Sequence, residues 1–213
     1  MKRILCYGDS NAWGHVPAKG TRYPDEVRWP GVMAKKLGLE YRVIEDNISG
    51  RTTLENDPGL PFRCGADNLG YSLLAHGPID LMILALGSND LKFTDAAGVR
   101  RNISRMIDLI RGADTLYYSF SPIFTEQPKI LLIAPPVILE EIKEIRPYHS
   151  LAHAAEESTK LGFHYAEVAK EKQVDFLDLS KLVRPSLDDC LHLTPEGHAV
   201  AGEAIAEKVL EIL

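Results

Sequence analysis

The chain has 213 residues, of which 45% are hydrophobic and 25% charged, as in ordinary globular proteins with one well-filled core. A formal net charge of −6 argues against nucleic acid and against an anionic membrane surface as partners. The three cysteines are odd in number and widely spaced, which argues against a disulfide framework and a finger-type zinc site. We therefore expect a single domain over residues 1–213, in a reducing compartment.

The apolar segments are too short for targeting or membrane insertion. Behind the basic start Met1-Lys2-Arg3 stand only four apolar residues, fewer than the h-region of a signal peptide contains. The longest apolar run, residues 130–139, falls short of the roughly 20 residues that span a bilayer, and Pro135-Pro136 interrupt it. We expect a cytoplasmic protein without a membrane partner.

Five short apolar runs have the length of buried strands. They are residues 4–7, 41–44, 81–86, 130–134 and 174–177. Segments with helical spacing separate them, and strands that alternate with helices form a parallel sheet covered on both faces. The expected fold class is therefore α/β.

The helical segments have recognisable starts and apolar faces. One helix is expected to begin near Trp29, and another after Asp67, whose side chain would be its N-cap. Strong helix formers predict a long helix over residues 151–172, and Thr194 is the expected N-cap of a last helix over residues 195–213. A clean amphipathic stripe predicts one more helix, through Val99, Ile103, Met106, Ile107 and Ile110.

Two long stretches, Arg51–Asp67 and Pro135–Pro147, are expected to be loops. Both are rich in turn residues or prolines, and both follow predicted strands. Loops of this length in a compact domain are usually functional, so we expect both at the active-site edge of the sheet.

The first turn of the chain places a serine at that edge. The apolar run 3–7 ends in Gly8-Asp9-Ser10, as when a buried strand breaks into a tight turn. In open α/β sheets the groups that meet ligand lie just past the carboxyl ends of the strands. Asp and Ser are also preferred helix caps, so this turn alone leaves a capping role open.

Three further polar segments follow strands or precede the last helix: Asn47–Gly50, Gly87–Asp90 and Asp189–His192. Acyl transfer through a serine needs a hydroxyl, a base, a carboxylate that orients the base, and hydrogen-bond donors for the oxyanion. Ser10 is the candidate nucleophile, His192 the base and Asp189 the orienting carboxylate. The backbone N–H groups of Ser10 and Gly50 and the side-chain amide of Asn89 are the candidate oxyanion donors.

These four segments, in this order, resemble the blocks of the SGNH (GDSL-type) hydrolases: the Gly-Asp-Ser turn, a loop glycine, Gly-x-Asn-Asp and Asp-x-x-His. The resemblance implies a flavodoxin-like three-layer α/β/α sandwich with five parallel strands in the order 2-1-3-4-5. It also implies a serine esterase that needs no cofactor.

Residues 8–14, 22–24 and 28–32 are similar to the arylesterase/acyltransferase branch of that family, although Asn11 stands where the family commonly has Leu. This similarity implies short-chain acyl or aryl ester substrates, acyl transfer to alcohols, and a homo-oligomer in which neighbouring subunits narrow the cleft into an apolar channel. The two long loops are the expected channel walls. The second loop would then expose apolar residues in a monomer, namely Ile138, Leu139, Ile142 and Ile145.

Other assignments stay open beside these. Trp13 and Phe93 are candidates for the substrate pocket, and core packing is an equally good explanation of both. Asp189 and His192 are metal-ligand types, but no third ligand lies at a regular spacing, so we expect no metal. The remaining histidines and Cys190 are expected to fill core or surface.

Two alternative functions remain at this stage. A carbohydrate acetylesterase would use the same nucleophile, with the long polar loops holding a sugar. A non-catalytic nucleotide- or phosphate-binding module would use the Gly8–Ser10 turn at a helix N-terminus. The chain contains neither Gly-x-Gly-x-x-Gly nor a P-loop sequence, which counts against the module.

Overall fold

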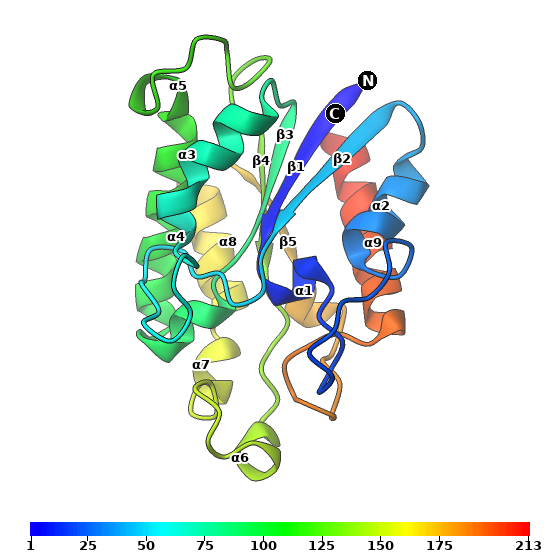
Figure 1. Ribbon diagram of the computed structural model, residues 1–213, viewed down its shortest axis with the longest axis vertical. Helices are drawn as coiled ribbons and strands as arrows, with labels where there is room; N and C mark the ends of the chain where they lie inside the picture. The colour runs from blue at the N-terminus through cyan, green and yellow to red at the C-terminus, as the bar shows by residue number, and fades with distance from the viewer.

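The computed structural model describes residues 1–213, and a five-stranded parallel sheet in the order β2-β1-β3-β4-β5 lies at its centre (Figure 1). The predicted strand order and α/β class are confirmed. The strands are β1 (Lys2–Gly8), β2 (Tyr41–Asn47), β3 (Leu81–Ala85), β4 (Ile130–Ala134) and β5 (Asp175–Asp178).

The register of the sheet brings three strand ends together. Gly8 at the end of β1 pairs with Asn47 at the end of β2 and with Ala85 at the end of β3. The segments that follow these three residues therefore leave the sheet side by side, at the edge where ligands bind in open α/β sheets.

Helices cover both faces of the sheet (Figure 1). On one face lie α3 (Gly65–His76), α4 (Ala96–Arg111) and α8 (Leu161–Lys172), and on the other lie α2 (Trp29–Leu37) and α9 (Pro195–Ile212). Alternate strand residues enter two separate cores, as the two-residue period of a strand requires: Leu5 packs under α4, whereas Ile4 packs under α9. The predicted stripe of α4 is buried throughout.

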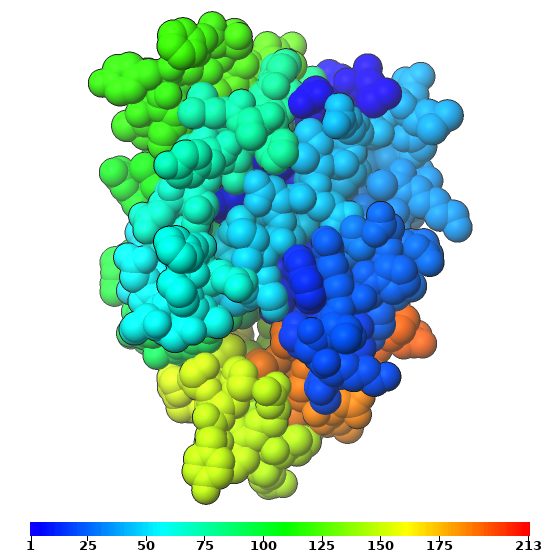
Figure 2. Space-filling model, viewed as in Figure 1, coloured from blue at the N-terminus to red at the C-terminus, as the bar shows by residue number.

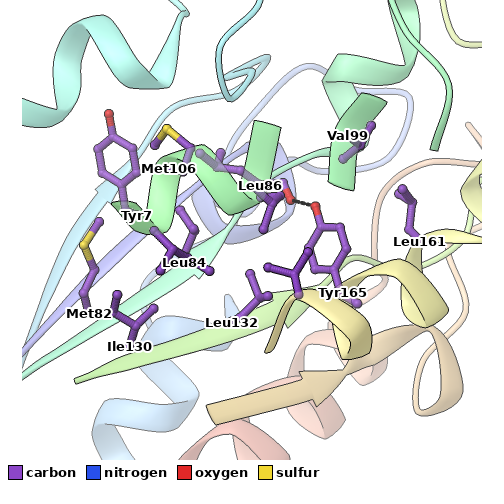
Figure 3. Close-up of a cluster of buried hydrophobic side chains, with 14 of the residues drawn as sticks. Tyr7, Met82, Leu84, Leu86, Val99, Met106, Ile130, Leu132, Leu161 and Tyr165 are labelled. Atoms are coloured by element: carbon purple, nitrogen blue, oxygen red, sulfur yellow. Dashed lines mark hydrogen bonds between the residues drawn. The ribbon is translucent and has the colours of Figure 1, made fainter. Parts of the chain in front are cut away.

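The larger core supports the turn that follows β3 (Figure 3). Tyr165 of α8 is fully buried, and its hydroxyl donates to the carbonyl oxygen of Leu86 at 2.5 Å. Gly87 comes next with φ +123°, and a Cβ at this position would lie 1.9 Å from the same hydroxyl. Only glycine accepts both the dihedral angle and the close approach, so the core fixes the path of the chain into the Asn89 segment.

The remaining helical pieces are short and surround the site edge or the opposite end. They are α1 (Ser10–Trp13), η1 (Ser88–Lys92), α5 (Ala113–Leu116), α6 (Ile142–Ile145), α7 (Ala155–Ser158) and η2 (Leu179–Lys181). None of the helices combines the length and the apolar composition that crossing a bilayer requires.

Two helix boundaries differ from the prediction. The helix predicted over 151–172 is broken into α7 and α8. At the break, the buried Ser158 hydroxyl donates to the carbonyl of Ala155 and accepts the N–H of Ile138. Side-chain bonds of this kind compete with the regular hydrogen bonds of a helix. Asp67 lies inside the first turn of α3 rather than at its N-cap. The helix begins earlier since Gly65 allows the chain to approach the carbonyl of Thr52.

The prediction that the second long loop exposes its apolar residues is wrong for three of the four. Ile138, Leu139 and Ile142 are at most 5% exposed and belong to the larger core, whereas Ile145 is 49% exposed. The loop folds back on the domain because its backbone is paired: the N–H of Leu139 donates to the carbonyl of Cys190 at 3.0 Å.

His198 of α9 is a buried histidine whose neutral form the fold requires. It is fully buried, its Nδ1 accepts the backbone N–H of Trp29 at 3.3 Å, and its Nε2 has no partner. Burial, with a smaller contribution from nearby His192, lowers the pKa of His198 from 6.5 to about 4. A histidine of this kind stabilises the fold above pH 6.5 and loses that contribution as the pH falls toward 4, since the unfolded chain binds the proton first.

We predict that His198→Gln flattens the pH dependence of stability. Between pH 7.5 and pH 5 the wild type should lose about 2 kcal/mol more of its free energy of unfolding than the variant does. Urea titrations at both pH values measure this difference, with His164→Gln as the control outside the core. Equal losses in wild type and His198→Gln would contradict the prediction.

Candidate active site

Ser10 is placed by a helix cap directly at the end of β1. The Asp9 carboxylate accepts the N–H of Asn11 at 3.0 Å and caps α1, whose first residue is Ser10. A Cβ on Gly8 would lie 2.5 Å from the Cβ of Ala12, so glycine allows α1 to turn back against the strand. The turn therefore has both of the roles considered from the sequence. Asp9 caps α1, and Ser10 lines the cavity described below.

Ser10, His192 and Asp189 form one chain of hydrogen bonds. The Ser10 Oγ lies 2.9 Å from His192 Nε2, and His192 Nδ1 lies 2.7 Å from Asp189 Oδ2. With Nδ1 protonated toward the carboxylate, Nε2 is left to accept the serine proton. The structure thus brings together the three residues that the sequence predicts, 182 positions apart at the extremes.

The Asp189 carboxylate is fully buried and fully hydrogen-bonded. Besides His192 Nδ1 it accepts the backbone N–H groups of Leu191 and His192 at 3.0 Å and of Ala18 at 3.1 Å. Burial opposes its ionisation, but the hydrogen bonds and charge of His192 and the backbone donors outweigh burial and hold the pKa of Asp189 well below its usual range. The carboxylate is therefore charged at neutral pH and fixes the imidazole.

Asn11 holds the same segment from the other side. Its Nδ2 donates to the carbonyl of Leu191 at 3.2 Å, and its Oδ1 accepts the N–H of Leu193 at 3.1 Å. One amide thus binds the backbone on both sides of His192. A leucine, which the family commonly has at this position, makes neither bond.

The three expected oxyanion donors border one cavity. Gly50 has φ +82° and lines the cavity together with Ser10 and Asn89. The amide nitrogen of Asn89 uses one hydrogen to donate to the carbonyl of Arg51 at 3.2 Å, which leaves the second available. The structure therefore places these groups around the cavity that contains Ser10.

The buried guanidinium of Arg51 holds the loop that contains Gly50 against the sheet. Arg51 is 1% exposed and stacks over the ring of Tyr7 at 3.8 Å. It donates to the backbone carbonyl and the carboxylate of Asp46, at 2.5 and 2.8 Å.

The neighbouring Thr53 binds the carboxylate of Asp90 through its N–H and its hydroxyl. Burial raises the pKa of Asp90 to about 6, although the hydrogen bonds from Thr53 act to lower it.

The cavity has a volume of about 350 Å³, and most of the residues that line it are polar or charged. Figure 2 shows the segments around it, cyan, yellow-green and blue, meeting in the lower half of the molecule. Besides the residues named above, the lining includes His15, Ser49, Leu60, Arg63, Ser88, Lys92, Pro136, Ile138, Arg146, His149 and Leu151.

Neither Trp13 nor Phe93, the two candidates for the substrate pocket, lines this cavity. The Trp13 ring packs under the guanidinium of Arg22 at 5.2 Å, on the far side of His15. Phe93 follows η1 with its side chain 43% exposed. Both residues lie in or directly after short helical turns, α1 and η1, and their place relative to the cavity does not follow from the sequence pattern.

His15, which we expected to be a filler, stacks on His192 with ring centroids 4.1 Å apart. Burial and the charge of His192 lower the pKa of His15 to about 4, so it is neutral at pH 7. His15, Asp189 and His192 lie close enough for a metal set. However, both ring nitrogens of His192 already have hydrogen-bond partners, Asp189 and Ser10, so a metal ion would have to displace one of these bonds.

Sequence reasoning missed Asn11, His15, Arg63 and Arg146 as parts of this region. No local pattern marks the two arginines, which lie in the long loops. For Asn11 the sequence does hold a signal, because a polar residue stands where the family commonly has leucine.

Comparisons with known proteins show the family and the fold of the chain. The model of the GDSL-like lipase/acylhydrolase family matches residues 6–200. The aryl esterase of M. smegmatis has 31% identity and a TM-score of 0.89, with all of both chains covered. A carbohydrate acetylesterase family member from Sinorhizobium meliloti has 32% identity and a TM-score of 0.90, covering 100% of this chain and 99% of the other. The Sinorhizobium meliloti carbohydrate acetylesterase Est24 has 29% identity and a TM-score of 0.89, with full coverage of both.

A comparison with curated protein sequences gives no match. The family match covers most of the chain, which argues against the non-catalytic phosphate-binding module. The chain therefore belongs to the GDSL-like lipase/acylhydrolase family, whose members are carboxylic ester hydrolases.

Proposed function

We propose that the protein is a serine esterase for small, short-chain acyl esters. The observation that carries the proposal is the hydrogen-bonded chain from Ser10 through His192 to Asp189 beside the cavity. Few other functions require a serine, an imidazole and a buried carboxylate in this order and at these distances.

In the proposed reaction, Ser10 Oγ attacks the ester carbonyl carbon while His192 Nε2 takes the hydroxyl proton. Negative charge develops on the carbonyl oxygen, and the N–H groups of Ser10 and Gly50 and the amide of Asn89 stabilise it. His192 then protonates the leaving alcohol, which leaves an acyl group on Ser10. Water attacks the acyl group with His192 again acting as base, and the acid leaves.

The size and lining of the cavity support small esters. A volume of about 350 Å³ holds an acetyl-like group and a modest alcohol.

A carbohydrate acetylesterase is the second candidate function, and the polar residues that line the cavity favour it. Within one chain the lining differs from the apolar channel that the branch resemblance implies, so such a channel would require a neighbouring subunit.

We further propose a homo-oligomer with some acyl transfer to alcohols. The support is exposed aromatic surface in the first long loop and directly after the second: Phe62 is 87% and Tyr148 101% exposed, and each adjoins a residue that lines the cavity. A subunit packed there would narrow the cavity mouth. Three free buried cysteines support a reducing compartment, and with it our proposal of a cytoplasmic location.

Ser10→Ala should abolish ester hydrolysis and leave the fold intact, because the nucleophile is lost and the remaining hydrogen bonds of α1 involve backbone and Asp9. A serine-directed organophosphate should attach at Ser10, as mass spectrometry of peptides will show. EDTA should have no effect. Turnover by Ser10→Ala at the wild-type rate, or loss of activity on chelation without labelling, would refute the nucleophile assignment.

A 4-nitrophenyl ester series from C2 to C12 should show a sharp preference for C2 to C4, and light scattering at micromolar concentration should show an oligomer. Phe62→Ser with Tyr148→Ser should lower the mass and broaden the chain-length range, because both residues would lie in the interface. Phe120→Ser, an equally exposed site at the α5 end, is the control. A monomeric wild type that hydrolyses C8 as fast as C2 would contradict this proposal.

Asn11 is proposed as a positioning residue for His192. Asn11→Leu should lower kcat roughly tenfold while KM changes much less, since two hydrogen bonds beside the base are lost. The lower limb of the kcat/KM pH profile should shift as well. Thr125→Val removes hydrogen bonds at the opposite end of the sheet and should lower Tm without these kinetic effects. An Asn11→Leu enzyme with unchanged kcat and pH profile would exclude the positioning role.

A further inference from the structure

The cavity beside Ser10 has a charge opposite to that of the whole chain. The protein carries a formal net charge of −6, yet no aspartate or glutamate lines this cavity. Three permanently cationic side chains do: Arg63, Lys92 and Arg146. The lining therefore departs from the acidic balance of the chain as a whole.

Lys92 is the one cation of the three that has a carboxylate partner. It forms an ion pair with Asp57 at 2.9 Å, and both side chains are about nine-tenths buried. Its charge is balanced within the fold, so it stiffens the first long loop against η1 and needs no ligand.

Arg63 and Arg146 have no acidic partner within ion-pair distance. Arg63 donates one hydrogen bond to the carbonyl of Ser49, beside Gly50, and its other side-chain N–H groups have no hydrogen-bond partner. Arg146 makes no side-chain hydrogen bond, although it is partly buried. Elsewhere several arginines are paired, as Arg28 is with Glu45 and Arg184 with Glu141.

The charge of Arg146 acts inside the cavity. After burial, Arg146 is the largest cause of the lowered pKa of His149, and it contributes to the lowered pKa of His15. Both histidines line the cavity, as His192 does. A cationic field of this kind attracts an anion and raises its local concentration.

We propose that the ester substrate carries an anionic group, such as a carboxylate, and that Arg146 and Arg63 bind it while Ser10 attacks the acyl carbonyl. This rests on the proposed esterase function and narrows its substrate class. Guanidinium groups bind carboxylate with paired, charge-assisted hydrogen bonds, which neither a neutral sugar nor a simple aryl ester offers. The position of Arg63 next to the Gly50 loop and of Arg146 in the second long loop places the anion between the two loops.

The test uses two esters that differ in charge, 4-acetoxybenzoate and its methyl ester, with kcat/KM measured for each. The ratio of anionic to neutral substrate should fall about tenfold in Arg146→Gln and in Arg63→Gln, as expected for loss of a charge-assisted hydrogen bond. Arg146→Lys should retain most of the ratio, because the charge remains. Raising the salt concentration should lower the wild-type ratio and leave that of Arg146→Gln nearly unchanged.

Arg184→Gln, an arginine outside this cavity, is the matched control and should keep the wild-type ratio. A ratio that stays the same in wild type, Arg146→Gln and Arg63→Gln would overturn the proposal, even though both esters are hydrolysed. Failure of the proposed esterase function gives a different result: either the wild type hydrolyses neither ester, or Ser10→Ala hydrolyses both as the wild type does.

Discussion

The candidate active site depends on one buried carboxylate. Asp189 accepts hydrogen bonds from the loop after α1, through Ala18, and from its own loop, through Leu191 and His192. A buried carboxylate without donors would cost several kcal/mol, so these donors must be in place before the group can be charged there. The same requirement orients the imidazole of His192 toward Ser10 and ties the last loop of the chain to the first.

A second set of contacts makes this arrangement rigid from the sheet side. Asn11 binds the backbone on both sides of His192, and the Arg51 guanidinium supports the loop of Gly50 against the ends of β1 and β2. The candidate nucleophile, base and oxyanion donors therefore rest on different elements, each held by buried hydrogen bonds. Preorganised donors of this kind need no rearrangement when charge develops on the substrate.

In the proposed substrate binding, substrate choice and catalysis rest on different segments. Ser10 and Asn89 follow strand ends and His192 lies in the loop before α9, whereas Arg63 and Arg146 lie in the two long loops. Loops tolerate change better than strand ends do, so one scaffold can keep its chemistry and alter its substrate through these positions. The exposed aromatics Phe62 and Tyr148 lie next to these positions in the chain, so the proposed subunit interface would adjoin the proposed substrate-binding arginines.

The sequence by itself predicted the strands and singled out Ser10, Asp189 and His192, because apolar runs and short motifs are local signals, whereas the strand order came from the resemblance to the SGNH hydrolases. It could not determine which way Trp13 and Phe93 point, whether Ile138 and Leu139 are buried, or that Asn11 and Arg146 face the site. Those outcomes depend on contacts between segments far apart in the chain, such as Leu139 with Cys190 and Asn11 with Leu193. A periodic pattern specifies an element and its buried face, but only packing decides which distant backbone groups that element meets.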